Sequence, residues 1–315
     1  MALAFIAPGQ GAQFVGMGME LAKSYPQSRS VFEEVDDALG ENLSDLIWYG
    51  SIEDLTLTEN AQPALMATTL AVFRALQSEG LKLSDAKFVA GHSLGEYSAL
   101  AMAESLSISD AAKLLRIRGR AMQNAVPVGV GAMAAILGLP YSDLVEITKQ
   151  AASNGVCQAA NDNDPSQVVV SGHKGAVERA IEIAKEAGAK RAILLPVSAP
   201  FHSELMAPAS LEMKDALSTI SIIEPTIPLV SNVRAQAVRL PAEIRSLLVE
   251  QVTGVVRWRE SIEWMANNGV TEMLEIGAGR ALSGMVRRIN RSISCASASN
   301  PDEVTKVILS QSEIR

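Results

Sequence analysis

The chain has few of the residues that hold small folds together by cross-links or metal ions, with only two cysteines, Cys157 and Cys295, among 315 residues. Two cysteines cannot make a disulfide framework or a four-cysteine zinc site. Aromatic residues make up 4% of the chain although 48% of it is hydrophobic, so the core must be aliphatic. The scarcity of cysteine predicts a protein of a reducing compartment, and we expect a cytoplasmic one without a metal site.

Long apolar runs and an excess of basic residues are also absent. The longest apolar stretch, Val128 to Leu139, is shorter than the ~18 residues that a membrane span needs, and glycines interrupt it. There are 27 Lys and Arg against 35 Asp and Glu, and the resulting net charge of −8 argues against nucleic acid or an anionic membrane as a bulk partner. The segment from Met1 to Gly11 has no basic region, which predicts a first strand rather than a signal peptide.

The order of the predicted elements indicates an α/β fold of two units. A helix is expected from Pro63, in its first turn, to about residue 79, followed by a strand at 87–90 and a helix at 96–104. Between 127 and 200 the expected order is β-α-β-β-α-β, the ferredoxin-like order, with Asp162–Pro165 as a turn between two strands. Proline- and glycine-bearing joints bound this segment. We predict an inserted domain at 127–199 within a catalytic domain formed by 1–126 and 200–315.

The strongest chemical signal is the pentapeptide Gly-His-Ser-Leu-Gly at 91–95, a G-x-S-x-G pattern between a predicted strand and a predicted helix. A sharp turn there exposes the hydroxyl of Ser93, and the flanking glycines let the backbone fold tightly. The following helix directs its positive N-terminal end at Ser93, and the backbone N–H of Leu94 is placed to stabilise an oxyanion. The motif predicts a serine nucleophile, with an ordinary strand-to-helix turn as the alternative.

A serine nucleophile needs a base, and the chain has three histidines, His92, His173 and His202. His92 is adjacent to Ser93, so its side chain should point away from it. His173 ends a predicted strand and fits a surface or capping position. His202 lies in a loop where the larger domain resumes, and such loops commonly carry function. Elimination selects His202 as the general base.

Arg118 is the other informative polar residue. The helix predicted at 110–124 places it in an apolar stripe with Leu114 and Ile117. A guanidinium that faces a core must find an anion, because an unpaired buried charge is costly. The partner is either an internal carboxylate or a carboxylate that the substrate brings and both guanidinium nitrogens hold. The sequence leaves both possibilities open.

Taken together, the motifs resemble those of the malonyl-CoA:acyl carrier protein transacylases of bacterial fatty-acid synthesis and of the acyltransferase domains of polyketide synthases. The resemblance covers essentially the whole chain. The matching segments are Pro8-Gly-Gln-Gly-Ala-Gln13, Gln62-Pro-Ala-Leu65, Gly91-His-Ser-Leu-Gly-Glu-Tyr-Ser-Ala-Leu100, Arg118-Gly119, Ala160-Asn-Asp-Asn163, Gln167-Val-Val-Val-Ser-Gly172, Phe201-His202, Gln251, Arg257-Trp258 and Glu275-Ile-Gly-Ala-Gly279. The resemblance implies an α/β-hydrolase-like large domain with an inserted ferredoxin-like small domain.

The resemblance also implies the catalytic roles. Ser93 would take the acyl group from coenzyme A, and His202 would be its general base. The backbone carbonyl of Gln251 would orient the histidine, in the place of the usual aspartate. The backbone N–H groups of Gln10 and Leu94 would form the oxyanion hole.

The substrate side of the site follows from the same resemblance. Arg118 would bind the malonyl carboxylate, Gln62 and Asn163 would line the site, and Phe201 would leave no room for the extra methyl of a methylmalonyl group. The implied reaction is ping-pong: malonyl-CoA acylates Ser93, and the phosphopantetheine thiol of holo acyl carrier protein then attacks the ester. No metal and no cofactor is implied, and we expect a monomer.

Three alternative functions stay open at this point. A serine thioesterase or other hydrolase would use the same groups with water, and a non-catalytic module would only bind the carrier protein. An acyltransferase for another extender unit, such as methylmalonyl-CoA, is the alternative within the class. For docking of the acidic carrier protein, the helix predicted at 279–291 leaves Arg287, Arg288 and Arg291 largely outside, although a solvated basic face would look the same.

Overall fold

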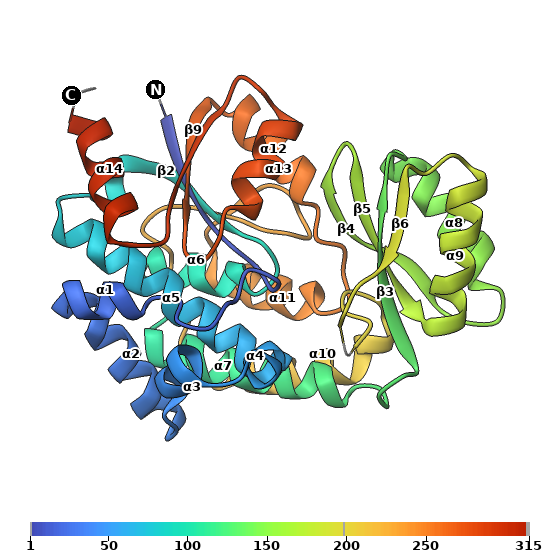
Figure 1. Ribbon diagram of the computed structural model, residues 1–315, viewed down its shortest axis with the longest axis horizontal. Helices are drawn as coiled ribbons and strands as arrows, with labels where there is room; N and C mark the ends of the chain where they lie inside the picture. The colour runs from blue at the N-terminus through green and yellow to red at the C-terminus, as the bar shows by residue number, and fades with distance from the viewer. Residues whose placement is uncertain (1, 198, 313–315) are drawn as a thin grey trace.

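The computed structural model describes residues 2–197 and 199–312, which form two sheets with helices packed against each (Figure 1). The larger sheet has the strand order β10-β9-β1-β2-β7-β8, and the smaller sheet has the order β4-β5-β3-β6. The segment that carries the smaller sheet, coloured green to yellow, lies to one side of the rest of the chain (Figure 1). Its elements run β-α-β-β-α-β, the order expected from the sequence.

The larger sheet is built around β1, a short run of apolar residues. Its strands are β1 (Ala2–Ala7), β2 (Ala86–Gly91), β7 (Leu229–Val230), β8 (Ala237–Val238), β9 (Val270–Ile276) and β10 (Ser294–Ala298). β1 pairs in parallel with β2 on one side and with β9 on the other, and Phe5 and Ile6 are fully buried. A strand that is covered on both faces needs apolar residues at successive positions, which explains its uninterrupted pattern.

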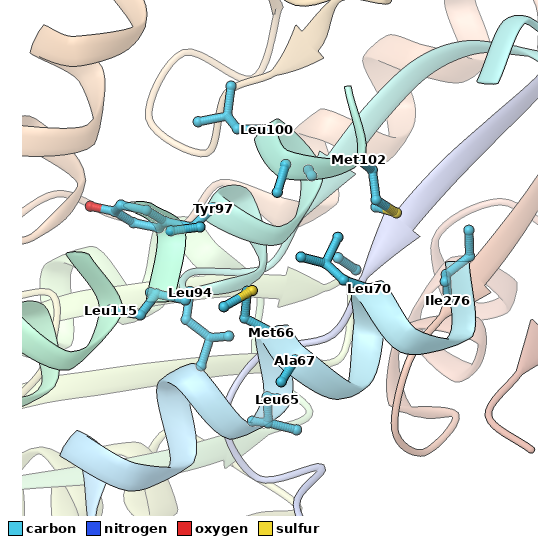
Figure 2. Packing of buried hydrophobic residues seen from close by; sticks show 14 of the residues in the cluster. Leu65, Met66, Ala67, Leu70, Leu94, Tyr97, Leu100, Met102, Leu115 and Ile276 are labelled. Atoms are coloured by element: carbon cyan, nitrogen blue, oxygen red, sulfur yellow. The ribbon is translucent and has the colours of Figure 1, made fainter. Parts of the chain in front are cut away.

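Helices cover both faces of this sheet. The helices of the larger unit, some of which pack on the sheet and others on those helices, are α1 (Met19–Ser24), α2 (Pro26–Leu39), α3 (Leu43–Tyr49), α4 (Ile52–Thr56), α5 (Thr58–Ser78), α6 (Gly95–Met102), α7 (Ile108–Asn124), α10 (Ala207–Ser218), α11 (Pro241–Gln251), α12 (Trp258–Asn267), α13 (Ala281–Ile289) and α14 (Pro301–Ser312), with short 3-10 turns at Leu83–Asp85 and Glu204–Met206. Figure 2 shows Met66 of α5 beside Leu94, the residue before α6, and Leu70 of α5 on the side of Met102 of α6. None of the helices in the described chain has the length and hydropathy that a membrane span requires.

The predicted start of the long helix at Pro63 is wrong, because α5 begins five residues earlier, at Thr58, and carries Pro63 inside it. A proline within a helix has no N–H to give to the carbonyl four residues before it, here that of Glu59. The Nη1 of Arg116 on α7 donates to this carbonyl at 2.8 Å. A side chain from the neighbouring helix therefore supplies the hydrogen bond that Pro63 cannot make.

The smaller unit consists of an antiparallel sheet and two helices. Its elements are β3 (Gly131–Leu137), α8 (Tyr141–Ala152), β4 (Cys157–Asp164), β5 (Gln167–His173), α9 (Lys174–Glu186) and β6 (Arg191–Leu194). Val177, Ala180 and Ile181 of α9 are buried on the sheet. These residues form a hydrophobic cluster separate from those of the larger unit.

The turn predicted at Asp162–Pro165 is also placed wrongly, because β4 continues to Asp164 and the turn is at residues 165–166. The strand extends because its backbone pairs with the larger unit: Asp162 N–H donates to the carbonyl of Val256 at 2.9 Å, and Val256 N–H donates to the carbonyl of Ala160 at 2.9 Å. Register shifts in the β4–β5 pair accompany this pairing. A contact between the units therefore overrides the local turn preference of the sequence.

Two ion pairs join β4 to the larger unit. Arg259 of α12 pairs with Asp162 at 2.7 Å, and Arg288 of α13 pairs with Asp164 at 2.9 Å. Both carboxylates are buried, whereas the Arg288 side chain is 47% exposed. Arg288 is thus on the exposed side of α13, as expected, and it also has a partner within the chain, so its role in docking stays a prediction.

Candidate active site

Ser93 stands on a tight turn between β2 and α6. Its φ is 53°, a left-handed conformation that is uncommon for a residue other than glycine. A Cβ at Gly91 would overlap the backbone of Gly95, and a Cβ at Gly95 would overlap the carbonyl oxygen of Ala7. Both flanking glycines are thus required for the turn to close, and the turn presents the Ser93 side chain at the carboxyl end of the sheet.

His202 is in contact with the Ser93 hydroxyl. Its Nε2 lies 2.8 Å from Ser93 Oγ, and its Nδ1 lies 2.9 Å from the backbone carbonyl oxygen of Gln251. A carbonyl only accepts, so Nδ1 carries the proton and Nε2 is left to accept from the hydroxyl. Burial and the positive charge of Arg118 lower the pKa of His202 to about 3. The ring is therefore neutral at neutral pH, which is the state that can accept a proton.

Arg118 is buried beside the same hydroxyl, with 1% of its surface exposed. Its Nη1 donates to Gln62 Oε1 at 2.7 Å, and its Nη2 donates to Gln251 Oε1 at 2.9 Å and to Ser93 Oγ at 3.2 Å. No carboxylate in the described part of the chain forms an ion pair with it. The sequence allowed two partners for Arg118, an internal carboxylate or a carboxylate of the substrate. Among the described residues, no internal carboxylate is in direct contact with it.

A cavity of about 570 Å³ lies between the two units and opens onto Ser93. The predicted site residues that line it are Gln10, Gln62, Ser93, Leu94, Arg118, Asn163, Phe201 and His202. Gln251 lies behind His202 and is fully buried. One site thus brings together residues from both units, which the chain separates by up to 241 positions, from 10 to 251.

The two histidines that were not predicted to be the general base, His92 and His173, have other hydrogen-bond partners. His92 Nε2 lies 2.9 Å from Asn163 Oδ1, so the ring of His92 bridges the two units at the cavity wall. His173 accepts a hydrogen bond from the backbone N–H of Val156 at 2.9 Å, within the smaller unit. Among the described residues, no three His, Cys, Asp or Glu side chains are grouped so as to hold a metal ion.

Comparison with known proteins decides the family, since the model of the acyl transferase domain matches residues 4–304. The chain belongs to the acyl transferase family. It is 46% identical to the malonyl CoA-acyl carrier protein transacylase of Bacillus subtilis, over 97% of this chain and 96% of that protein. The crystal structure of an acyl-carrier-protein S-malonyltransferase from Bartonella henselae is 53% identical and has a TM-score of 0.96, covering 98% of this chain and 99% of that one.

A third match is a complex, described as a type II polyketide synthase acyl-carrier protein with its malonyl-transacylase. It is 39% identical, with a TM-score of 0.95 over 98% of this chain and 100% of that one. These solved structures share the mixed α/β architecture with two sheets that the described residues form.

Sequence reasoning missed Asn232 in this acyl transferase. Its Oδ1 accepts from the backbone N–H of Ser93 at 2.8 Å, and its Nδ2 donates to the carbonyl of Gly91 at 2.7 Å. Asn232 therefore holds both sides of the turn that carries the serine. It follows β7, which pairs in parallel with β2, so that the carboxyl ends of the two strands meet. A strand of two residues gives too little pattern to be predicted, and no sequence signal marks the asparagine.

Glu96 was missed as well, although it lies in the segment that carries the serine motif. It is 1% exposed, and its Oε2 accepts from Gln251 Nε2 at 2.7 Å and from the backbone N–H of Asn232 at 3.2 Å. Burial raises its pKa to about 7. The only sequence signal was an acidic residue at the start of a predicted helix whose residues 97–103 are small or apolar.

Proposed function

We propose that this acyl transferase moves the malonyl group from malonyl-CoA to the phosphopantetheine thiol of acyl carrier protein, for fatty-acid biosynthesis. The observation that carries the choice of acyl group is the buried Arg118, whose Nη2 is 3.2 Å from Ser93 Oγ. A malonyl carboxylate is two carbon–carbon bonds from the acyl carbon, so a guanidinium beside the nucleophile can reach it. The names of the relatives support the same acyl donor and acceptor.

In the first half-reaction, Ser93 Oγ attacks the thioester carbon while His202 Nε2 takes the hydroxyl proton. The backbone N–H groups of Gln10 and Leu94 stabilise the oxygen that becomes negative. Leu94 directly precedes α6, where the first N–H groups of a helix lack intrahelical acceptors. The C–S bond then breaks, the proton on His202 passes to the sulfur of coenzyme A, and malonyl-Ser93 is left.

In the second half-reaction, the carrier protein's thiol gives its proton to His202 and its sulfur attacks the ester carbon. The C–O bond to Ser93 breaks, and the proton on His202 returns to Oγ. The Gln251 carbonyl keeps Nδ1–H in place through both halves, so the ring always offers Nε2 to the reacting atoms. No metal, redox group or organic cofactor takes part in this scheme.

Several finer assignments belong to the same proposal. Gln62 and Asn163 shape the cavity, and Phe201 narrows it against a branched acyl group. The strand orders support an α/β-hydrolase-like domain at 1–126 and 200–315 with a ferredoxin-like insertion at 127–199. The cytoplasmic location and the monomeric state stay predictions of the sequence.

Two measurements test the proposed function. Loss of malonyl-CoA is followed with and without holo carrier protein, and the intact mass of the protein is recorded before the carrier protein is added. A transferase gives a malonyl adduct on Ser93 and thioester loss that depends on the carrier protein, and Ser93→Ala gives neither while folding normally. Equal loss with and without carrier protein would show a hydrolase, and no adduct at all would show a binding module.

A further inference from the structure

Glu96 is a buried carboxyl group that the proposed mechanism does not use. It projects from the first turn of α6, three residues after Ser93, and has no direct hydrogen bond to Ser93 Oγ or to His202. Two of the residues that it contacts, Gln251 and Asn232, touch the reacting groups. Gln251 holds His202 through its carbonyl and Arg118 through Oε1, and Asn232 holds the backbone N–H of Ser93.

The side-chain amide of Gln251 has one orientation that satisfies its neighbours. Arg118 has only donors, so the atom of Gln251 that faces it must be the oxygen. An ionised Glu96 has only acceptors, so the atom that faces it must be the nitrogen, which also donates to the carbonyl of Ser93 at 3.0 Å. Gln251 thus forms a neutral bridge between a buried cation and a buried carboxylate.

We propose that Glu96 is a positioning residue, whose carboxylate fixes the Gln251 amide and the Asn232 backbone and thereby holds Arg118 and Ser93 in their reactive arrangement. Loss of the carboxylate frees the amide of Gln251 to rotate and to present its nitrogen to Arg118, where two donors would face each other. Malonyl transfer then weakens although every residue of the predicted dyad is intact. This inference rests on the proposed function.

Protonation of Glu96 is one way to lose this carboxylate. Burial raises the pKa of Glu96 to about 7, against the hydrogen bonds of Gln251 and Asn232 and the positive charge of Arg118, which lower it. Since a raised pKa means that the proton is bound below about pH 7, the positioning carboxylate is present above that pH and is lost below it. The same range contains no titration of His202, whose pKa is lowered to about 3.

Other groups around α6 do not replace Arg118 as the charge that faces Glu96. The adjacent Tyr97 stays neutral, because burial raises its pKa, and Ser231 is uncharged. Four charged side chains on α5, α7 and β2 have partners other than Glu96. Glu59 pairs with Arg120, and Arg116 pairs with Glu41. Arg74 donates to Gln77, and Lys87 donates to the carbonyl of Asn268.

The experiment measures kcat/KM for acylation by malonyl-CoA between pH 5.5 and 8.5 in the wild type, Glu96→Gln and Glu96→Met. The wild type should lose roughly tenfold between pH 8 and pH 6, as a single group with a pKa of about 7 takes up its proton. Glu96→Gln is neutral like the protonated acid and cannot titrate, so its activity at pH 8 should be at least about tenfold below that of the wild type and its profile should be flat. Glu96→Met removes the acceptor and should lose about 10- to 100-fold at every pH.

Glu275→Gln is the matched control. Glu275 is also fully buried, burial also raises its pKa, and it caps α13 by accepting from Leu282 and Ser283 without touching Gln251 or Asn232. This variant should lower the melting temperature and leave the shape of the pH profile as in the wild type. A change of profile in Glu96→Gln alone would then be specific to the contact with Gln251.

Three results would overturn the inference. One is a wild-type profile that is flat between pH 6 and 8, which needs no variant and so stands even if the variants do not fold. Another is a Glu96→Gln variant whose activity still falls from pH 8 to pH 6, since the titration of His202 would then cause the fall. The third is a Glu96→Met variant as active as the wild type. Absence of acylation in the wild type itself would instead refute the proposed function, so the two failures are distinguishable.

Discussion

Replacement of Arg118 by alanine should change which acyl group the enzyme accepts. The variant loses the two terminal nitrogens that now donate to Gln62, Gln251 and Ser93 and that the proposed function assigns to the malonyl carboxylate. Loss of one partner of a buried charge pair commonly costs about 2–5 kcal/mol. At about 1.4 kcal/mol per tenfold, malonyl transfer should fall by roughly 30- to 5,000-fold. Acetyl-CoA brings no carboxylate to be stranded, so its transfer should be unchanged or improved.

The folding stability of Arg118→Ala should change little. Arg118 has no carboxylate in direct contact within the described residues, and burial lowers its pKa, which means that the fold itself disfavours the charge. Removing a buried cation of this kind relieves a desolvation cost that offsets the lost hydrogen bonds. The melting temperature of the variant should therefore stay within a few degrees of the wild type.

Arg116→Ala provides a control on the same helix. Arg116 is also buried, but it pairs with Glu41 at 2.9 Å and satisfies the Glu59 carbonyl that Pro63 leaves without a donor. Its loss should cost about 1–3 kcal/mol of stability, because the part-buried Glu59 carbonyl loses its donor. The ratio of malonyl to acetyl transfer should stay as in the wild type, since Arg116 does not line the cavity.

The assay measures single-turnover acylation by malonyl-CoA and by acetyl-CoA, together with thermal unfolding, on both variants. The reasoning requires a collapse of malonyl preference in Arg118→Ala alone. A parallel loss of both substrates with a lower melting temperature would refute it, because that result would assign Arg118 a structural role.

Further expectations follow from the same geometry. His202→Ala should slow acylation by roughly 10²–10⁴-fold in rapid-quench experiments, and a rate within a few-fold of the wild type would mean that another group is the base. Asp164→Asn should lower the unfolding free energy by about 1–3 kcal/mol in denaturant titrations, because the buried Asp164 carboxylate pairs with Arg288; unchanged stability would contradict this role. Arg287→Glu should raise the KM for carrier protein in a salt-dependent way without slowing acylation, and an unchanged KM would discard Arg287 as a docking residue.

The sequence was most informative where a local motif dictates local geometry. Ser93 was found because a tight strand-to-helix turn needs glycine at 91 and 95, and the overlaps that a Cβ would make there show why. Arg118 stood out because a guanidinium in an apolar helix stripe is rare enough to need an explanation. Both signals come from within one element, so neither depends on knowing which distant segments meet.

The supporting residues Glu96 and Asn232 carry no such local signal. Asn232 reaches the Ser93 turn only because β7 pairs with β2, and the two residues are 139 positions apart. The importance of Glu96 follows from its contact with Gln251, which is 155 positions away. Acidic and amide side chains are ordinary in solvent-facing turns and helices, and only their burial separates these from the rest.

Pro63 is another residue whose structure depends on a contact that the local sequence does not reveal. A proline typically marks the first turn of a helix, and the prediction placed the start of α5 there for that reason. The helix tolerates Pro63 in its interior because Arg116 donates to the carbonyl that the proline leaves free. Proline is usually excluded from a helix interior because one carbonyl loses its hydrogen bond. Here a side chain of the neighbouring helix supplies that hydrogen bond, so the exclusion does not hold.

The wrong prediction of a turn at the end of β4 also concealed how the smaller unit is attached at the site. The run Asp-Asn-Asp-Pro is typical of a turn, yet Asp162 and Asp164 are held by Arg259 and Arg288 of the larger unit, 97 and 124 positions away. Asn163 stands between these two anchored carboxylates and reaches across to His92, at the wall of the cavity. The two ion pairs therefore fix the smaller unit at the point where it contributes a residue to the site. Charges that look like solvated turn residues in the sequence set the position of one wall of the cavity that holds Ser93.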